Sequence, residues 1–333
     1  MKQTKLVVQP WRTIYTFSTP TDTIELVVQF SQPTSIDDPF TYITFDVRTL
    51  DKQTHSIRIY FEQSSSLVIN SNDDKVYWTR TDNSEIIDLS ISAYNQVPFG
   101  VHGHSERNNW GYAHLISSVS SQTKGYQGSA DKLRQAFIQQ QPMPDDDTDK
   151  PRYPNVDPVS SAFVIDLGEI SSDIVSSYLI FLYDDVYSMY YFQEKQPPIW
   201  RAKFNNNLTL LITKAISSYL VNMIDITESN QMLITLLTNA GGSKYAQLCS
   251  LALRQITGAL SRTWSYEQDR SFLFMKEISS GGAVSTVDVI YPSSPYFLWI
   301  YPEMLRDLLL PILAYANNET TVHYNLTWAP HHL

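Results

Sequence analysis

The sequence predicts a multidomain chain in which an antiparallel β-sandwich precedes a helical part. From residue 23 to about residue 94, apolar and polar residues alternate, which is the period of half-buried strands. After Asn205 the apolar residues recur every 3.6 positions, which is the period of amphipathic helices. The chain has 333 residues, and a single core stops growing at roughly 250 residues. We therefore expect a sandwich over residues 1–204 and a helical domain over residues 205–333.

Each predicted strand has its own pattern. The alternating segments are residues 24–30, 43–47, 57–61 and 87–93. Their short, regular spacing favours a sandwich over βαβ units. Residues 110–117 and 162–167 continue the strand pattern, and a short helix is expected over residues 131–139. Residues 177–183 are almost wholly apolar, so we expect a central strand that is buried on both faces.

Three helices are expected in the second part. The first carries an apolar stripe over residues 208–224, and the second covers residues 245–260, after Gly241 and Gly242. The third begins at Pro302, since proline suits a first helical turn. Pro311 should kink that third helix. Three such helices leave a wide apolar surface, so we expect the chain to be the front portion of a longer protein.

Composition limits the partners. The formal net charge is −10 without clustered Lys or Arg, so we expect no nucleic-acid partner. No apolar run approaches the roughly 18 residues that span a bilayer.

Cys249 lies in a helical pattern and is expected in the core. The chain carries no cofactor motif and no HExxH or CxxC motif, so we expect neither a cofactor nor a metal. His102 and His104 lack a third ligand and are interpreted as surface residues.

Residues 276–295, KEISSGGAVSTVDVIYPSSP, form the candidate site. They combine the pair Lys276 and Glu277, a Ser-Ser-Gly-Gly turn, Asp288 and the aromatic residue Tyr291. Glycine and proline are frequent here, so we expect a loop or hairpin between helices. Glu277 and Asp288 could supply an acid and a base. Alternatively, the charged pair is merely exposed, and Asp288 only satisfies a turn.

Aromatic residues also gather over residues 183–200, after Asp184 and Asp185. They could form a rim that stacks on a polar ligand. Packing between domains is the favoured interpretation, because aromatic side chains dominate such contacts.

Seven segments, in order, resemble the fungal glutaminase A family. The resemblance implies a sandwich followed by a six-hairpin (α/α)6 toroid, here incomplete, with the active site at the toroid's mouth. It also implies a hydrolase that converts glutamine to glutamate and ammonia. The segments are FTYITFDVRTLDKQTHSIRIYF (residues 40–61), NNWGYAHLI (108–116), YDDVYSMYYF (183–192), AGGSKYAQLCSLALRQ (240–255), FMKEISSGGAVSTVDVIYPSSPYFLW (274–299), PILAYANN (311–318) and APHHL (329–333).

Amide hydrolysis would use Glu277 and Asp288 as catalytic groups. Lys276 or His331 would neutralise developing charge, and the backbone of residues 279–282 would donate to the oxyanion. Trp110 and Tyr291 are the aromatic candidates for contact with a small polar substrate, glutamine or a saccharide.

Two alternatives stay open. One is glycoside hydrolysis or sugar binding, which needs two carboxylates about 5 to 9 Å apart. The other is an inactive remnant, because the family usually carries acids where Asn109 and His332 stand. A carboxylate's charge and basicity are lost in both changes.

The resemblance implies an extracellular parent protein, although this chain shows no signal peptide. Asn207, Asn318 and Asn325 lie in glycosylation sequons, which is compatible with secretion.

Overall fold

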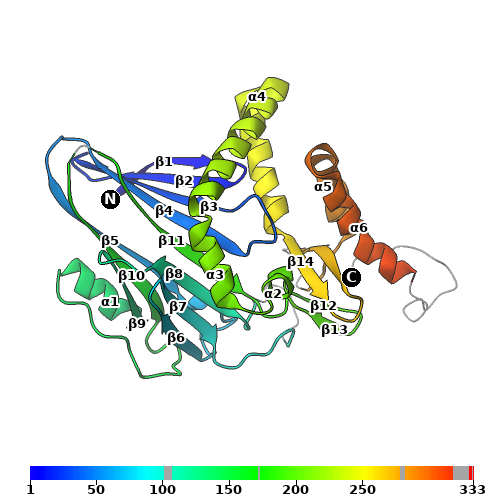
Figure 1. The fold of residues 1–333 in the computed structure, drawn as a ribbon, viewed down its shortest axis with the longest axis horizontal. Coiled ribbons are helices and arrows are strands. Elements are labelled where there is room, and N and C mark those ends of the chain that lie inside the picture. The colour runs from blue at the N-terminus through cyan, green and yellow to red at the C-terminus, as the bar shows by residue number, and fades with distance from the viewer. Residues whose placement is uncertain (101–106, 172, 278–281, 318–329, 332) are drawn as a thin grey trace.

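The computed structural model describes residues 1–333 except 101–106, 172, 278–281, 318–329 and 332. Its N-terminal part is a pair of facing antiparallel β-sheets, and a helical part follows (Figure 1). The larger sheet has the order β1-β2-β3-β4-β11-β8-β7-β6. Its strands are β1 Lys2–Val8, β2 Arg12–Ser18, β3 Ile24–Ser31, β4 Phe40–Thr49, β6 Val76–Asp82, β7 Ile86–Ala93, β8 Tyr112–Ser118 and β11 Val175–Asp184.

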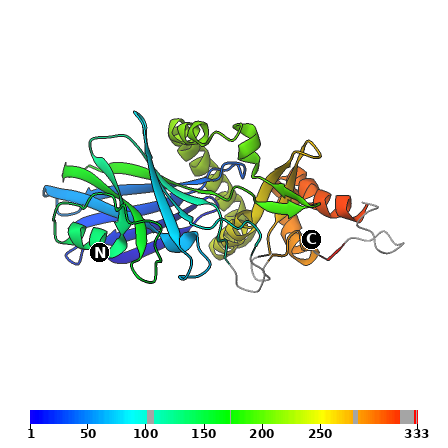
Figure 2. The same cartoon turned by 90° about the horizontal axis from the view of Figure 1, so that it is seen from below.

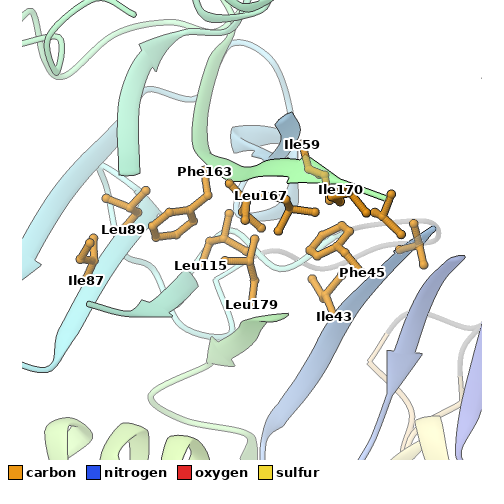
Figure 3. Packing of buried hydrophobic residues seen from close by; sticks show 13 residues of the cluster. Ile43, Phe45, Ile59, Ile87, Leu89, Leu115, Phe163, Leu167, Ile170 and Leu179 are labelled. Atoms are coloured by element: carbon orange, nitrogen blue, oxygen red, sulfur yellow. The ribbon is translucent and has the colours of Figure 1, made fainter. Parts of the chain in front are cut away.

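The smaller sheet has the order β5-β10-β9, with β5 His55–Ser64, β9 Thr123–Ser129 and β10 Val159–Ile170. It covers the inner face of the larger sheet. Phe163 and Leu167 of β10 pack there against Phe45, Leu115 and Leu179 of the facing strands (Figure 3). These side chains are buried, which confirms the predicted sandwich. A 3-10 turn at Ser65–Leu67 follows β5, and α1, Ala130–Ile138, follows β9.

The predicted central strand is confirmed, because β11 lies between β4 and β8. Its outward side chains are covered by α2, Ile199–Lys203, and α3, Leu208–Ser217. Ile180 and Leu182 of β11 pack there with Trp200 and Leu211. Part of the larger sheet is therefore buried on both faces.

The prediction of a single helix over residues 208–224 is wrong, because two helices cover this stretch. α3 ends at Ser217, and α4, Tyr219–Gly258, leaves it at a bend of 64°. Within α4, Gly242 has a φ of 84°, so the helix breaks at the predicted pair of glycines. Only glycine adopts this backbone readily, because it has no Cβ. The predicted start of a helix after Gly241 and Gly242 is thus confirmed.

Two small hairpins join the parts. One consists of β12, Met189–Tyr191, and β13, Glu194–Gln196; the other of β14, Leu260–Ser265, and β15, Arg270–Met275. Placing residue 260 in a helix was therefore wrong. Tyr191 packs edge-on against Phe272 and Phe274, with ring centroids 5.3 and 5.2 Å apart. The packing interpretation of the aromatic segment is confirmed for Tyr191, which is buried.

The expectation of a loop or hairpin over residues 276–295 is wrong in its second half. α5 spans Val287–Ile300 and contains Pro292 and Pro295. Prolines remove backbone donors from a helix. The hydroxyls of Ser293 and Ser294 both donate to the carbonyl of Ile290 at 2.8 Å, which adds side-chain hydrogen bonds to this proline-containing segment. The third predicted helix is α6, Pro302–Ala316, which continues through Pro311.

α4 lies between the sandwich and the end formed by α5 and α6 (Figure 2). The indole of Trp11 is buried against Ile226, Leu233 and Leu253 of α4. The backbone amide of Trp11 donates to Oδ1 of Asn230 at 2.9 Å. The two parts therefore share a core. The predicted boundary between residues 204 and 205 stays a prediction.

Within the described part of the chain, no single helix combines the length and the hydropathy needed to cross a bilayer. α3 and α4 reach that threshold only when taken together across their bend.

Candidate functional site

Lys276 and Glu277 follow directly after β15, where the chain turns back on itself. Lys276 forms an antiparallel bridge with Val284, and its amide donates to the carbonyl of Ala259 at 2.8 Å. The Glu277 amide donates to Ala283 at 3.1 Å. Both side chains are half-buried. The turn thus holds the two charged groups at fixed positions beside the hairpin. Of the expected oxyanion donors over residues 279–282, only Gly282 belongs to the described residues.

Glu277 is held by the residue that precedes α5. The Thr286 hydroxyl donates to Glu277 Oε2 at 3.0 Å, and Thr286 is buried. Its neighbour Ser285 is also buried and has a φ of 52°. The Ser285 hydroxyl is buried without a hydrogen-bond partner. Unusual backbone and an unpaired polar atom often mark functional sites. Sequence reasoning missed Ser285, since no local motif signals a strained serine.

Asp288, His331 and Tyr291 lie at the surface. Asp288 is in the first turn of α5, where a carboxylate complements the helix dipole. Its Oδ2 is 3.6 Å from Nε2 of His331, and about two thirds of each side chain is exposed. The backbone of His331 accepts from Val287 at 2.9 Å. Tyr291 is 78% exposed. The structure therefore groups Asp288 with His331, and it groups Glu277 with Thr286.

Asp185 is a further carboxylate that sequence reasoning did not single out as a site residue. It lies in the turn after β11, and burial raises the pKa of its carboxyl. Lys276 opposes the rise in the pKa of Asp185, and Asp184 adds to it. Asp184 itself is buried in an ion pair with Arg201, at 2.5 Å. The turn thus offers two different carboxyl groups. Asp184 is paired with Arg201, and Asp185 takes up a proton more readily than an ordinary aspartate.

Trp110 lies beside this turn. Its indole donates to the carbonyl of Tyr187 at 3.1 Å, and its own carbonyl accepts from the Tyr183 hydroxyl at 2.6 Å. Gly111 has a φ of 94°, and a Cβ there would lie 2.6 Å from the Asp184 carbonyl. Glycine is therefore required for this close approach. Trp110 is mostly buried, so it positions the turn more than it offers a surface.

Where the sandwich meets the second hairpin, Lys276 lies close enough to Asp185 to affect the pKa of its carboxyl, and Glu277 is the next residue along the chain. A carboxyl with a raised pKa can donate a proton, and an ionised carboxylate can accept one. An acid and a base of this kind are the groups that hydrolysis requires. Among the described residues, no group of three His, Cys, Asp or Glu side chains is arranged to hold a metal.

Several predicted residues lie outside the described part of the chain. They are His102, His104, Asn318, Asn325 and His332. Asn207 is described, and it caps α3 by accepting from the amide of Leu210 at 3.2 Å. Asn109 is half-buried, and its amide oxygen has no hydrogen-bond partner.

Two family models match consecutive stretches of the chain. The model described as "Domain of unknown function (DUF5127)" matches residues 11–230, which is more than half of the chain. The model described as "Glutaminase A six helical-hairpin domain" matches residues 242–333. The second match starts at Gly242, where the helix α4 breaks.

Two curated proteins are similar to this chain. Glutaminase A of Aspergillus oryzae is 26% identical over 327 residues, which cover 93% of this chain and 45% of that protein. A probable glutaminase of Arthroderma benhamiae is 35% identical over 116 residues, covering 35% of this chain and 13% of that protein. The chain therefore spans at most about half the length of the curated relatives it matches.

Proposed function

The chain belongs to the family described as "Domain of unknown function (DUF5127)", and we propose that it serves in a glutaminase A-like hydrolase. Its residues 242–333 match the glutaminase A six helical-hairpin domain. The proposed reaction is the hydrolysis of L-glutamine to L-glutamate and ammonia. Both curated relatives carry the word glutaminase in their names. The fold alone would leave the chemistry open, since one architecture can host many reactions.

One observation carries the proposal at the level of residues. Asp185 comes from the sandwich, and Lys276 and Glu277 come from the glutaminase A-like part. Lys276 is close enough to Asp185 to affect the pKa of its carboxyl. Active sites are often built where two structural units meet, because each contributes groups to one cleft. We therefore place the reaction at this meeting point.

In the proposed mechanism, Glu277 accepts a proton from water as the water oxygen attacks the amide carbon. The carbon–nitrogen bond then breaks, and protonated Asp185 donates its proton to the leaving nitrogen, so that ammonia departs. Lys276 stabilises the negative charge that develops on the carbonyl oxygen. The Thr286 hydroxyl holds Glu277 in place by its hydrogen bond of 3.0 Å. Asp288 and His331 form a second exposed pair, whose part in catalysis the assay below decides.

The test is ammonia release from L-glutamine by the purified protein, followed with a coupled glutamate assay. We expect Asp185→Asn and Glu277→Gln to lower kcat at least a hundredfold, within the range for general acid–base groups. Glu267→Gln, an exposed carboxylate in the turn between β14 and β15, is the matched control and should match the parent protein. Asp288→Asn should retain most activity.

Equal rates for Asp185→Asn, Glu277→Gln and Glu267→Gln would refute the assignment of residues. Release of reducing sugar from oligosaccharides, without ammonia from glutamine, would replace amide hydrolysis by glycoside hydrolysis. No turnover of either substrate would favour an inactive remnant.

An extracellular location belongs to the same proposal. Asn207 is exposed, and its Oδ1 accepts the capping hydrogen bond. A glycan is attached through the amide nitrogen, so it leaves that oxygen free to cap the helix. Protein secreted from a eukaryotic host should lose mass on treatment with an N-glycosidase, and Asn207→Asp should reduce this loss. No change in mass would contradict glycosylation.

A further inference from the structure

One end of the larger sheet has an outer face that the described helices leave uncovered. α2 and α3 cover the other end, where the outward side chains are apolar. Over β6, β7 and β8 the outward row is instead Tyr77, Ser92 and Tyr112, which the strand register places side by side. Thr79 and Ser90 form the next row, with their hydroxyls 2.9 Å apart. This end is thus aromatic and hydroxyl-rich.

The same face is hollowed. A cavity of about 330 Å³ lies over the two rows, and another of about 360 Å³ adjoins it. Both are lined by Ala93 and Tyr94, and Tyr153 lines the second cavity. Ligand sites typically enclose about 300–1,000 Å³. We call the surface formed by Tyr77, Tyr94, Tyr112 and Tyr153 the tyrosine trough.

The tyrosine trough presents exposed aromatic rings and also hydroxyl groups that lack a hydrogen-bond partner in the described residues. Tyr94, Tyr112 and Tyr153 are 52, 37 and 42% exposed, and none of their hydroxyls has a hydrogen-bond partner in the described residues. The Ser92 hydroxyl at the floor is likewise without one. Asn109 lines the second cavity and brings a side-chain amide to it. Exposed aromatic rings beside free polar groups suit a ligand with both apolar and polar faces.

Charge narrows the class of ligand. Asp73, Asp74 and Lys75 line the second cavity. Asp74 already accepts from the Ser71 amide, and Asp73 from Asn155, both at 3.0 Å. Lys75 lies over the ring of Tyr153, with its Nζ 4.9 Å from the ring centroid. The Nζ atom of Lys150 lies 5.0 Å from the centroid of the Tyr77 ring. The two carboxylates thus face two ammonium groups, and this balance favours a neutral ligand over a charged one.

We propose that the tyrosine trough binds a neutral oligosaccharide. Sugar rings present C–H faces that pack on tyrosine rings, and their hydroxyls can pair with the Ser92 hydroxyl and the tyrosine hydroxyls. The two adjoining cavities accommodate more than one sugar unit in a row. Tyr112 is the register partner of Asp184, so one end of the trough approaches the turn that holds Asp185. Tyr94 and Tyr153 take no part in the proposed hydrolysis, so binding at these residues can be tested apart from it.

The experiment is affinity electrophoresis of the purified protein in gels that contain soluble β-glucan, xylan, galactomannan or glycogen. Isothermal titration with the hexasaccharide of the retarding polymer follows. We expect at least one polymer to retard the protein, and Tyr94→Ala and Tyr112→Ala to weaken hexasaccharide binding about tenfold each, which is the scale of one lost stacking contact. Tyr112→Phe should weaken it less, because it keeps the ring.

Tyr266→Ala is the matched control, because this tyrosine is 58% exposed but lies in the turn after β14. It should bind the hexasaccharide as the parent protein does. Tyr94 follows β7 in an exposed turn, so Tyr94→Ala decides the matter if Tyr112→Ala unfolds. Absence of retardation in all four gels, or equal binding by Tyr94→Ala and Tyr266→Ala, would overturn the proposal. Glutamine hydrolysis by Tyr94→Ala should be unchanged, which separates this test from that of the proposed function.

Discussion

At the scale of single residues, the candidate site depends on two carboxyl groups in different surroundings. Burial and the neighbouring Asp184 raise the pKa of Asp185, while Lys276 limits the rise. Glu277 is instead held by a hydroxyl donor, Thr286. Different surroundings for two carboxyl groups are what separate an acid from a base at one pH. Each group can be tested by a substitution that changes little else.

The first prediction concerns pH. The pKa of Asp185 is raised in the folded state, so the folded protein binds the proton more tightly than the unfolded chain does. The contribution of this group to stability is therefore present below its unfolded pKa of about 4 and is lost as pH rises through the folded pKa. Asp185→Asn should gain stability relative to the parent as pH rises through this window, measured by urea unfolding at several pH values. Parallel curves for the two proteins would contradict the shift.

The second prediction concerns the positioning of Glu277. Thr286→Val keeps the shape of the side chain but removes the donor, so Glu277 loses a hydrogen bond. We expect kcat for glutamine hydrolysis to fall about tenfold, with KM changed less, because the contact orients a group that acts in the transition state. Thr286→Ser should restore most of kcat. Equal rates for Thr286→Val and Thr286→Ser would show that the contact is only structural.

At the scale of elements, the sequence was informative where one face of a strand or helix is buried. The alternating residues of β3, β4 and β7 were recognised because their polar faces interrupt the apolar ones. β1 was missed, since its residues are mostly exposed and its first four residues are all polar, so no alternation appears. β15 was missed because a short apolar run does not distinguish a strand from a helix. The proline-rich α5 was missed because its stabilising contacts come from neighbouring elements.

The candidate site was predictable only in part for the same reason. Glu277 and Lys276 stand out as a charged pair next to glycines. The pKa of Asp185 is raised by burial and lowered in part by Lys276, about ninety positions away, and no local pattern records either influence.

The third prediction concerns the break in α4. Gly242 has a φ of 84°, so Gly242→Ala should cost roughly 1 kcal/mol of stability or more, because alanine is strained there. Gly258 ends the same helix without a positive φ, and a Cβ there would meet nothing within 4 Å. Gly258→Ala should therefore stabilise the protein slightly. Denaturant unfolding of both variants measures the difference, and equal effects would refute the role of Gly242.

At the scale of the whole molecule, the sandwich and the helices share buried surface. Trp11 lies between β1 and β2, and packs against α4. Arg262 of β14 forms ion pairs of 3.0 Å with both Asp37 and Asp307, which lie in the sandwich part and in α6. The two parts should therefore unfold together.

The fourth prediction tests this coupling. Trp11→Ala removes a buried indole from the shared core and should cost about 3–5 kcal/mol. Trp299→Ala, in α5, is the control, since half of that side chain is exposed and its loss should cost much less. Calorimetry of the parent should give one transition. Two transitions in the parent, or equal costs for the two variants, would contradict a shared core.

The position of β11 also governs how the chain can fold during its synthesis. β11 lies between β4 and β8, yet it is made after both of them. Until residue 184 has left the ribosome, the nascent sheet consists of two halves, each with an open edge where β11 will pair. Open strand edges invite pairing with other chains. The growing polypeptide therefore exposes two unpaired strand edges for longer than a sheet built only of consecutive hairpins would.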